Sequence, residues 1–429
     1  MPKKIHLTGF MLYSPAPHTQ LSWVYPPEKI RHPWHSIQYW EEIAQTLERG
    51  CFDMFFFADG WAGGGEIGTR YAIQFPTHDP VTLVSRLSGV TKHLGFAVTM
   101  STSFYAPYMT ARKLSTLDHI TEGRIGWNVV NSLNTGEARN FGMDGLLPHD
   151  ERYDRADEYM EVCNRLWESW EPDAIKMDME NRIFADPDKV HRIDFEGKYF
   201  KCMGPLNVIP SPQGKPVIFQ AGASPRGREF AVRHAECVFG AGGSTAAMRE
   251  FSDDIAARAD AAGRDPVKII WGAQPIVAES ESEARERQQE IVERIPIEAG
   301  LVTMAGHFNI DLSKVDIDTP VSKLPQIDGT RGMLDIYTRD GADPTLKEIA
   351  RSYLNLAAGN LVGTPEQVAD VLQHLIEAGG GDGFQLTPAW YAPDYYRDIV
   401  NLLIPELQRR DCVRQSYRGR TLREHLGEF

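Results

Sequence analysis

Short apolar runs rich in β-branched and aromatic residues alternate with longer segments of helical period along most of the chain. This order is typical of repeated strand–helix–strand units, whose parallel strands are buried on both faces. Eight such runs are present, and they begin at Ile5, Met54, Leu94, Arg124, Val217, Cys237, Lys268 and Gly383. Eight strands with helices between them predict an α/β fold, a closed (β/α)8 TIM barrel. A doubly wound open sheet would leave the eighth unit without a role.

Helices are expected in the segments between these runs. The clearest helical periods span residues 36–50, 110–123, 245–263 and 364–380. Thr364 followed by Pro365 and Glu366 is a common helix start. Gly263 and Gly379 stand where two of these helices are expected to end.

The runs are unevenly spaced, although 429 residues fit a single elaborated barrel. Two intervals, about residues 132–215 and about residues 279–360, are longer than compact domains usually leave without structure. We expect them to be helical insertions, after the fourth and seventh strands, that build over one end of the barrel. Residues 1–429 are therefore treated as one domain.

The composition narrows the possible partners and the compartment. A formal net charge of −14 disfavours binding to nucleic acid or to an anionic membrane surface. No run of about 18 apolar residues is present, so a cytoplasmic protein is expected. The five cysteines lie far apart without a CxxC pair, which indicates isolated reduced thiols. The basic ending, residues 409–429, is expected to pack on the chain's own acidic surface or on a neighbouring subunit.

Candidate site residues can be selected from the predicted barrel, because its reacting groups come from the carboxyl ends of strands and the loops after them. That rule selects Asp59, Ser101, Thr102, Asn128, Ser224 and the small-residue run 240–244. A polar group that ends a buried strand is costly unless it is paired. Each of these side chains is therefore either a satisfied structural contact or part of a site, and their shared location favours a site.

The segment around Ser224 is the clearest candidate for binding an anion. Gly222, Ala223 and Ser224 lie where the fifth run turns into a helix. Small residues let backbone N–H groups approach an anion, and a helix N-terminus favours a phosphate. Arg226 or Arg228 would add positive charge. The alternative is a tight turn with solvated arginines.

Several other motifs are excluded by their context. Gly63, Gly65 and Gly68 match GxGxxG, but Pro76 interrupts the segment after these glycines, and no helix is expected to open there. A loop at the barrel mouth is therefore predicted instead of a dinucleotide site. The histidines are scattered without HExxH, so no metal site is predicted, and no GxSxG elbow is present. A phosphate cradle without a hydrolytic apparatus indicates that a cofactor carries the chemistry.

Five segments closely resemble, in order and over essentially the whole chain, the nitrilotriacetate monooxygenase family. They are TEGRIGWNVVNS, HDERYDRADEY, FQAGASPRG, VGTPEQVADVL and LIPELQRRDCVRQSYRGRTLREHLG. This family is a branch of the bacterial-luciferase-like flavin monooxygenases. The branch also includes the monooxygenases of dibenzothiophene sulfone, dimethyl sulfide, EDTA and long alkanes. The motifs are specific for the family and not for a substrate.

The resemblance implies a (β/α)8 barrel that takes reduced FMN (FMNH2) from a separate NAD(P)H:flavin reductase. With O2 as co-substrate, such an enzyme forms a peroxyflavin that oxygenates a small or medium organic substrate. The substrate would be a sulfur compound, an aminopolycarboxylate, an alkane or a ketone. We also expect a homodimer or homotetramer.

Carried onto matching positions, the resemblance implies an FMN site. Its residues would be Asp59, Ser101, Asn128, His149, Tyr153, Gly222, Ala223 and Ser224. Asp59 and Asn128 would flank the isoalloxazine, whereas Tyr153 and Ser224 would reach the ribityl chain and phosphate. The contact from the third strand stays open among Ser101, Thr102 and Ser103.

The catalytic candidates are His149 and Asn128, together with His18 and His307. His149 lies just before a predicted helix and four residues before Tyr153, so both side chains could face the flavin; the alternative is that His149 only caps the helix. His18, Trp23 and His307 lie in segments where family members differ, which makes them candidates for the substrate side. An aromatic mouth would comprise Phe10, Trp23, Tyr25, Phe57, Trp61, Phe104, Trp127 and Trp390, unless these rings pack under the insertions.

Two other functions are compatible with the same barrel. The first is an oxidoreductase that uses the deazaflavin F420, although such chains are generally shorter and lack the long basic ending. The second is a non-catalytic flavin-binding protein. Reconstitution with FMNH2 under air distinguishes all three, because only the monooxygenase yields an oxygenated product.

Overall fold

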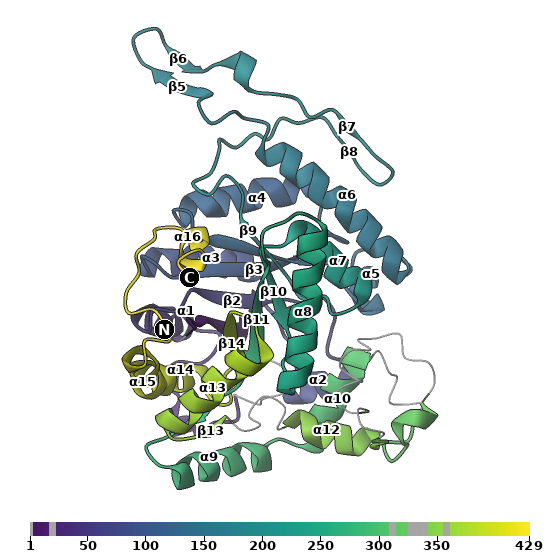
Figure 1. The fold of residues 1–429 in the computed structure, drawn as a ribbon. Coiled ribbons are helices and arrows are strands. Elements are labelled where there is room, and N and C mark those ends of the chain that lie inside the picture. The colour runs from purple at the N-terminus through teal and green to yellow at the C-terminus, as the bar shows by residue number, and fades with distance from the viewer. Residues whose placement is uncertain (1–2, 17–22, 309–314, 325–337, 339–341, 355–360) are drawn as a thin grey trace.

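Eight parallel strands form a closed barrel, and each strand pairs with two neighbours (Figure 1). Around the barrel they are β1 (His6–Leu12), β2 (Met54–Ala58), β3 (Gly95–Ser101), β4 (Ile125–Val130), β9 (Val217–Gln220), β10 (Cys237–Gly240), β11 (Lys268–Ala273) and β14 (Gly383–Leu386). This computed structural model describes residues 3–16, 23–308, 315–324, 338, 342–354 and 361–429. The predicted barrel is confirmed, and each of the eight apolar runs contains one of its strands.

Helices surround the strands on the outside of the barrel. They are α1 (Ile37–Arg49), α3 (Pro80–Leu87), α4 (Pro107–Ile120), α6 (His149–Trp167), α7 (Pro225–His234), α8 (Thr245–Ala261), α13 (Pro365–Gly379) and α14 (Ala392–Asp398). The largest apolar cluster lies between these helices and the outer faces of the strands. The four predicted helices are all present. Thr364 caps α13 in a reciprocal pair with Gln367, and Gly380, one residue beyond the predicted end, adopts a positive φ of 78°.

A second apolar cluster fills the inside of the barrel. Phe10, Met54 and Phe219 point inward from their strands and contact Leu422 and Leu426 of the short helix α16 (Leu422–Leu426). This helix closes the amino end of the barrel. A Cβ atom on Gly95 would lie 2.6 Å from the Leu422 side chain, so α16 packs against β3 too closely for a residue larger than glycine at position 95. Only the carboxyl end of the barrel is left for a site.

A buried ion-pair network holds α16 and the segment before it in place. Arg414 donates to Asp53 at 2.9 Å and to Glu428 at 2.8 Å, and His6 contacts Asp53 at 3.0 Å. The side chains of Arg414 and Asp53 are only 3% and 2% exposed. Burial alone would raise the pKa of Asp53, but His6 and Arg414 outweigh it and hold the pKa well below its usual value. The basic ending therefore packs on acidic residues of its own chain.

The interval after β4 holds helices and also strands that the sequence analysis did not predict. It begins with α5 (Thr135–Asn140) and α6. Two small antiparallel hairpins come next, β5 (Ile175–Asp178) with β6 (Ile183–Ala185) and β7 (Phe195–Glu196) with β8 (Lys201–Cys202). The hairpins extend away from the barrel (Figure 1), so only the helical part lies near its mouth.

The interval after β11 packs partly on the main core, through β12 and β13, and partly in a small core of its own. It contains β12 (Ile276–Val277), α9 (Glu281–Arg294), α10 (Ile297–Phe308), α12 (Leu346–Leu354) and β13 (Val362–Gly363). Leu301 and Met304 of α10 pack on Leu346 and Ile349 of α12 in a small core of their own. None of the helices in the described part of the chain has the length and apolarity to cross a membrane.

The glycine-rich loop after β2 lies at the barrel mouth, as predicted, but it leads into a short helix, α2 (Gly65–Tyr71). The expectation that no helix opens there is wrong. Gly65, the first residue of α2, adopts a positive φ of 61°, which glycine tolerates without strain. At seven residues, α2 is too short to be seen as a helical period in the sequence.

We predict that Arg414→Met destabilises the protein by about 3–5 kcal/mol, because Asp53 is left as a buried carboxylate without its main partner. The folded pKa of Asp53 lies below its ordinary value of 3.8, so its stabilising contribution is complete above pH 3.8 and is lost as the pH falls further. Chemical unfolding measured at pH 7 tests the first statement, and the same measurement at a pH well below 3.8 tests the second. Arg420→Met, an exposed position in the same ending, is the control and should change the unfolding midpoint little. Equal effects of the two variants would contradict the role of the network.

Candidate active site

A cavity of about 710 Å³ opens at the carboxyl end of the barrel strands. Its walls come from the segments that succeed β2, β4 and β9, and from the helices α6 and α10. Reacting groups of TIM barrels lie at this end, where the loops after the strands converge. This cavity is therefore the candidate active site.

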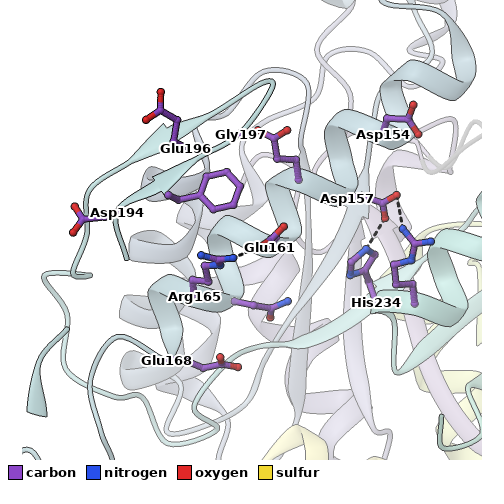
Figure 2. A pocket seen from close by; sticks show the side chains of 13 residues that line it. Asp154, Asp157, Glu161, Arg165, Glu168, Asp194, Glu196, Gly197 and His234 are labelled. Atoms are coloured by element: carbon purple, nitrogen blue, oxygen red, sulfur yellow. Dashed lines mark hydrogen bonds and ion pairs between the residues drawn. The ribbon is translucent and has the colours of Figure 1, made fainter. Parts of the chain in front are cut away.

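A second hollow, of about 960 Å³, lies outside the barrel between α6, α7 and the β7 strand, and is lined mostly by carboxylates (Figure 2). Asp157 lies at its edge and pairs with Arg226, with Arg233 at 2.9 Å and with His234 at 2.7 Å. None of the described residues that line it lies directly after a barrel strand. Although it is larger, it lacks the convergence of strand ends that defines the site of this fold.

One end of the active-site cavity is built for an anion. Ser224 caps α7, and its hydroxyl accepts the N–H of Gly227 at 3.0 Å. The N-terminus of a helix carries partial positive charge and free N–H groups. A Cβ on Gly222 would lie 2.9 Å from the Tyr153 hydroxyl and would clash with Gln220. Glycine is thus required at residue 222 because Tyr153 and Gln220 pack directly against its backbone, and its N–H donates to Gln220 Oε1 at 2.7 Å.

His149 and Tyr153 line the same end from the first turns of α6. Their rings meet edge to face with centroids 5.1 Å apart, and His149 Nε2 lies 3.4 Å from the Ser224 hydroxyl. His149 is the first residue of the helix, and its Nδ1 contacts Asp150 at 2.7 Å. Burial raises the pKa of the Tyr153 phenol, and hydrogen bonds with Ser224 and Asn131 oppose this shift. The two side chains therefore face the same side, as the spacing predicts.

The arginine that lines this cavity is Arg152. It donates through Nη1 to the Leu147 carbonyl at 2.9 Å, whereas its buried Nε has no hydrogen-bond partner among the described residues. Arg226 is occupied by Asp154 and Asp157, and Arg228 by Asp254. Since neither of these arginines lines the cavity, Arg152 replaces them as the candidate for contact with an anion.

Asp59 lies directly after β2 and lines the opposite side of the cavity. Its carboxyl accepts the N–H of Gly60 at 2.9 Å. Burial raises the pKa of Asp59 to about 8, with further contributions from the charges of Asp79 and Glu137. At neutral pH this side chain is thus mostly a neutral acid, able to donate a proton or a hydrogen bond.

Asn128 and Ser101 lie inside the barrel below the cavity and do not line it. Asn128 donates to the Thr99 hydroxyl at 2.9 Å, and its buried Oδ1 has no partner among the described residues. The Ser101 hydroxyl contacts that of Ser132, which does line the cavity, at 2.9 Å. Ser101 therefore reaches the cavity only through Ser132. Thr102 and Ser103 likewise bond to backbone carbonyls at and after the end of β4, at 3.4 and 2.8 Å.

Several cavity residues were missed by the sequence analysis. Asn131 and Ser132 come directly after β4, so the strand-end rule could have selected them. Glu137 and Arg152 lie on helices of the insertion, where no sequence signal points to the cavity. Of the predicted aromatic mouth only Trp61 is among the described residues that line the cavity. Phe57 and Trp127 are instead fully buried in the outer core, whereas Phe104 packs edge to face on Trp61 with ring centroids 5.9 Å apart.

The remaining candidates are placed only in part. His18 lies outside the described residues. His307 belongs to α10, which covers the cavity through Val302, Thr303 and Ala305, but its side chain is outside the described part. Trp23 is exposed and donates to the Tyr71 carbonyl at 3.0 Å. The run 240–244 caps α8 through Ser244 and is not among the residues that line the cavity. In the described part of the chain no cluster of three potential metal ligands occurs.

Comparison with known proteins identifies relatives that are mostly named as monooxygenases. The sequence matches the model of the family described as luciferase-like monooxygenase over residues 14–382. It is 42% identical over 435 residues to the long-chain alkane monooxygenase of Geobacillus thermodenitrificans (strain NG80-2), covering 99% of this chain and 94% of that protein. It is 38% identical over 422 residues to nitrilotriacetate monooxygenase component A of Aminobacter aminovorans, covering 94% and 92%. The crystal structure of riboflavin lyase with modified FMN and riboflavin superimposes with a TM-score of 0.90 at 35% identity, covering 99% and 96%.

We predict that Asp59 titrates near pH 8, because it is buried beside other carboxylates. Its folded pKa is raised, so wild-type stability declines as the pH rises from 3.8 through about 8. The variant Asp59→Asn lacks this proton and should lose that part of the pH dependence. Carboxyl-selective NMR on ¹³C-labelled protein measures the pKa directly, and Asp144→Asn serves as an exposed control. A pKa for Asp59 near its ordinary value of 3.8 would contradict the prediction.

Proposed function

The chain belongs to the luciferase-like monooxygenase family, and we propose that it is the oxygenase component of a two-component enzyme that uses reduced FMN and O2. Membership makes it a flavin-dependent monooxygenase. The proposal adds three points: the flavin is FMN, a separate reductase supplies it, and the cavity residues named below hold it.

The chemistry of the cavity fits FMN. A phosphate needs N–H donors and positive charge, and the N-terminus of α7 with Ser224 and Arg152 offers both. Arg152 Nε is buried without a partner among the described residues, which is costly unless a ligand satisfies it. The volume of about 710 Å³ lies within the range of cofactor sites. The observation that carries the proposal is this pairing of a helix N-terminus with a partly unsatisfied arginine.

The ring system of the flavin would lie towards Asp59. Asp59 offers a protonated carboxyl at the cavity wall. Asn128, which points into the barrel below the cavity, has a buried Oδ1 without a partner among the described residues. An unpaired acceptor and a neutral acid are the kinds of group that a flavin edge, with its alternating donors and acceptors, can use. Ser101 would act only indirectly, by holding Ser132.

When bound, reduced FMN supplies the two electrons that reduce one oxygen atom of O2 to water while the other atom enters the substrate. The protein's own residues bind, orient and move protons. Tyr153 and Arg152 fix the phosphate end. Asp59 holds a proton at neutral pH and can return one to the site. His149, half exposed at the cavity rim, can exchange a proton with solvent, whereas α10 covers the mouth and limits water.

The proposed partner is an NAD(P)H:flavin reductase. The GxGxxG match leads into a helix of only seven residues, which is shorter than the helix of a pyridine-nucleotide-binding strand–helix–strand unit, and we therefore assign reduction of the flavin to another protein. A relative at 38% identity is named as component A of its enzyme, which supports the division of labour. Self-association as a homodimer or homotetramer stays a prediction.

Ser224→Ala and Tyr153→Phe are expected to weaken FMN binding by roughly 1.5–3 kcal/mol each, which is about 10- to 150-fold in Kd, because each removes a hydrogen bond to a charged group. Fluorescence titration of oxidised FMN measures the Kd. Ser244→Ala is the matched control, since Ser244 caps α8 in the same way but does not line the cavity. Unchanged FMN affinity in both variants would show that the FMN phosphate does not bind at the N-terminus of α7.

With FMNH2 supplied in air, the protein is expected to oxygenate an organic substrate, and oxygen-18 from ¹⁸O2 should appear in the product. With NADH alone it should not consume oxygen until a flavin reductase is added. A panel of thioethers, sulfones, alkanes, cyclic ketones and aminopolycarboxylates identifies the substrate. Efficient oxidation of NADH by the pure protein, or product oxygen derived from water, would refute the proposed function.

A further inference from the structure

We propose that the substrate is an uncharged, largely apolar molecule and not a carboxylate or an amine. The inference rests on the proposed function, because it assigns the part of the cavity that the flavin leaves free. It separates the uncharged sulfur compounds, alkanes and ketones from the aminopolycarboxylates.

The cavity has two chemically different ends. The order of strands around the barrel places β4 and β9 next to each other, with β1 and β2 on another side. Arg152, His149 and Ser224 lie at the end over β4 and β9. The end over β1 and β2 is bounded by Leu12, the loop after β2, and helix α10. Among the described lining residues, positive charge is therefore confined to one end.

Aliphatic and aromatic groups make up most of the side chains at the other end. Leu12, Trp61, Ile73, Val302 and Ala305 line it beside the amide of Gln74. Ile73 packs with Ile295 and Ala299, which holds α10 against the segment after α2. The Thr303 hydroxyl is occupied by the Ala299 carbonyl at 3.0 Å. A substrate placed here would bury apolar surface against these side chains, which favours hydrocarbon parts of a ligand.

The ionisable groups at this end are carboxyls. Among the described lining residues they are Asp59 and Glu137, whereas the cation Arg152 lies at the other end together with His149. Glu137 is buried and accepts the Trp61 N–H at 3.1 Å. An anionic substrate would meet a buried carboxyl and none of the described cations, and burying a charge without a partner is strongly unfavourable.

A cationic substrate is disfavoured for a different reason. Asp59 accepts the Gly60 N–H and is largely protonated at neutral pH, so it offers little charge to an ammonium group. Glu137 is buried, so an ammonium group could pair with it only by giving up its own hydration. An anionic substrate that lay at the other end of the cavity instead would compete with the FMN phosphate for Arg152. An uncharged ligand occupies the free end without the desolvation of a charge.

Three probes that differ only in their terminal groups test this. Dipropyl sulfide ends in methyl groups, 3,3′-thiodipropionate replaces them by carboxylates, and bis(2-aminoethyl) sulfide replaces them by ammonium groups. Calorimetric titration of the full-length protein, with and without saturating oxidised FMN, measures binding without turnover. The sulfide is expected to bind at least tenfold more tightly than either charged probe. A charged probe that binds as tightly as the sulfide, or a protein that binds none of the three, would overturn the inference.

A positive charge introduced on α10 checks that the probes occupy this end. Val302→Lys should raise the affinity for thiodipropionate at least tenfold and lower that for the sulfide. Gln289→Lys adds the same charge at an exposed position of α9 and should change neither. Unchanged affinities in Val302→Lys contradict the assignment of this end.

The readouts separate this inference from the proposed function. Tight binding of the sulfide without oxygen transfer under FMNH2 and air would refute the monooxygenase reaction for this substrate class and leave the charge preference standing. Preferred binding and oxygenation of thiodipropionate would refute the charge preference and leave the monooxygenase standing.

Discussion

The closed ring of parallel strands is the constraint on which the rest of this structure depends. Each strand bonds to two neighbours, so all eight carboxyl ends meet at one rim. Side chains far apart in the sequence, such as Asp59, Ser132 and Ser224, are brought to one cavity for this reason alone. The loops after the strands can then vary without disturbing the backbone hydrogen bonds that hold the barrel.

The opposite end of the barrel is sealed by apolar packing and by a buried ion pair. Leu422 and Leu426 fill it, and Arg414 with Asp53 fixes the segment that carries them. A buried pair of this kind contributes little net stability but penalises any arrangement that separates its partners. The basic residues of the chain ending thus stabilise the position of α16. The polar side chains of the candidate site lie at the opposite rim of the barrel.

At that rim the two insertions contribute different chemistry. Helix α6 brings Arg152 and Tyr153 to the end that suits a phosphate, and α10 brings apolar side chains to the other. The barrel supplies the neutral acid Asp59 between them. The proposed division into a cofactor end and a substrate end is compatible with relatives whose names state substrates as different as an alkane and nitrilotriacetate.

The sequence by itself determined the barrel. Eight apolar runs with helices between them fit a closed eight-stranded barrel, whereas a doubly wound open sheet would leave the eighth unit without a role. The sequence also selected Asp59 and Ser224, since polar residues at strand ends must converge. Only the tertiary structure decided which arginine faces the cavity, because Arg152, Arg226 and Arg228 differ in their partners and not in local pattern. It also moved Phe57 and Trp127 from the predicted mouth to the core. Strand alternation limits a side chain to one of two faces, but the packing of distant helices decides which face is buried and which opens to a ligand.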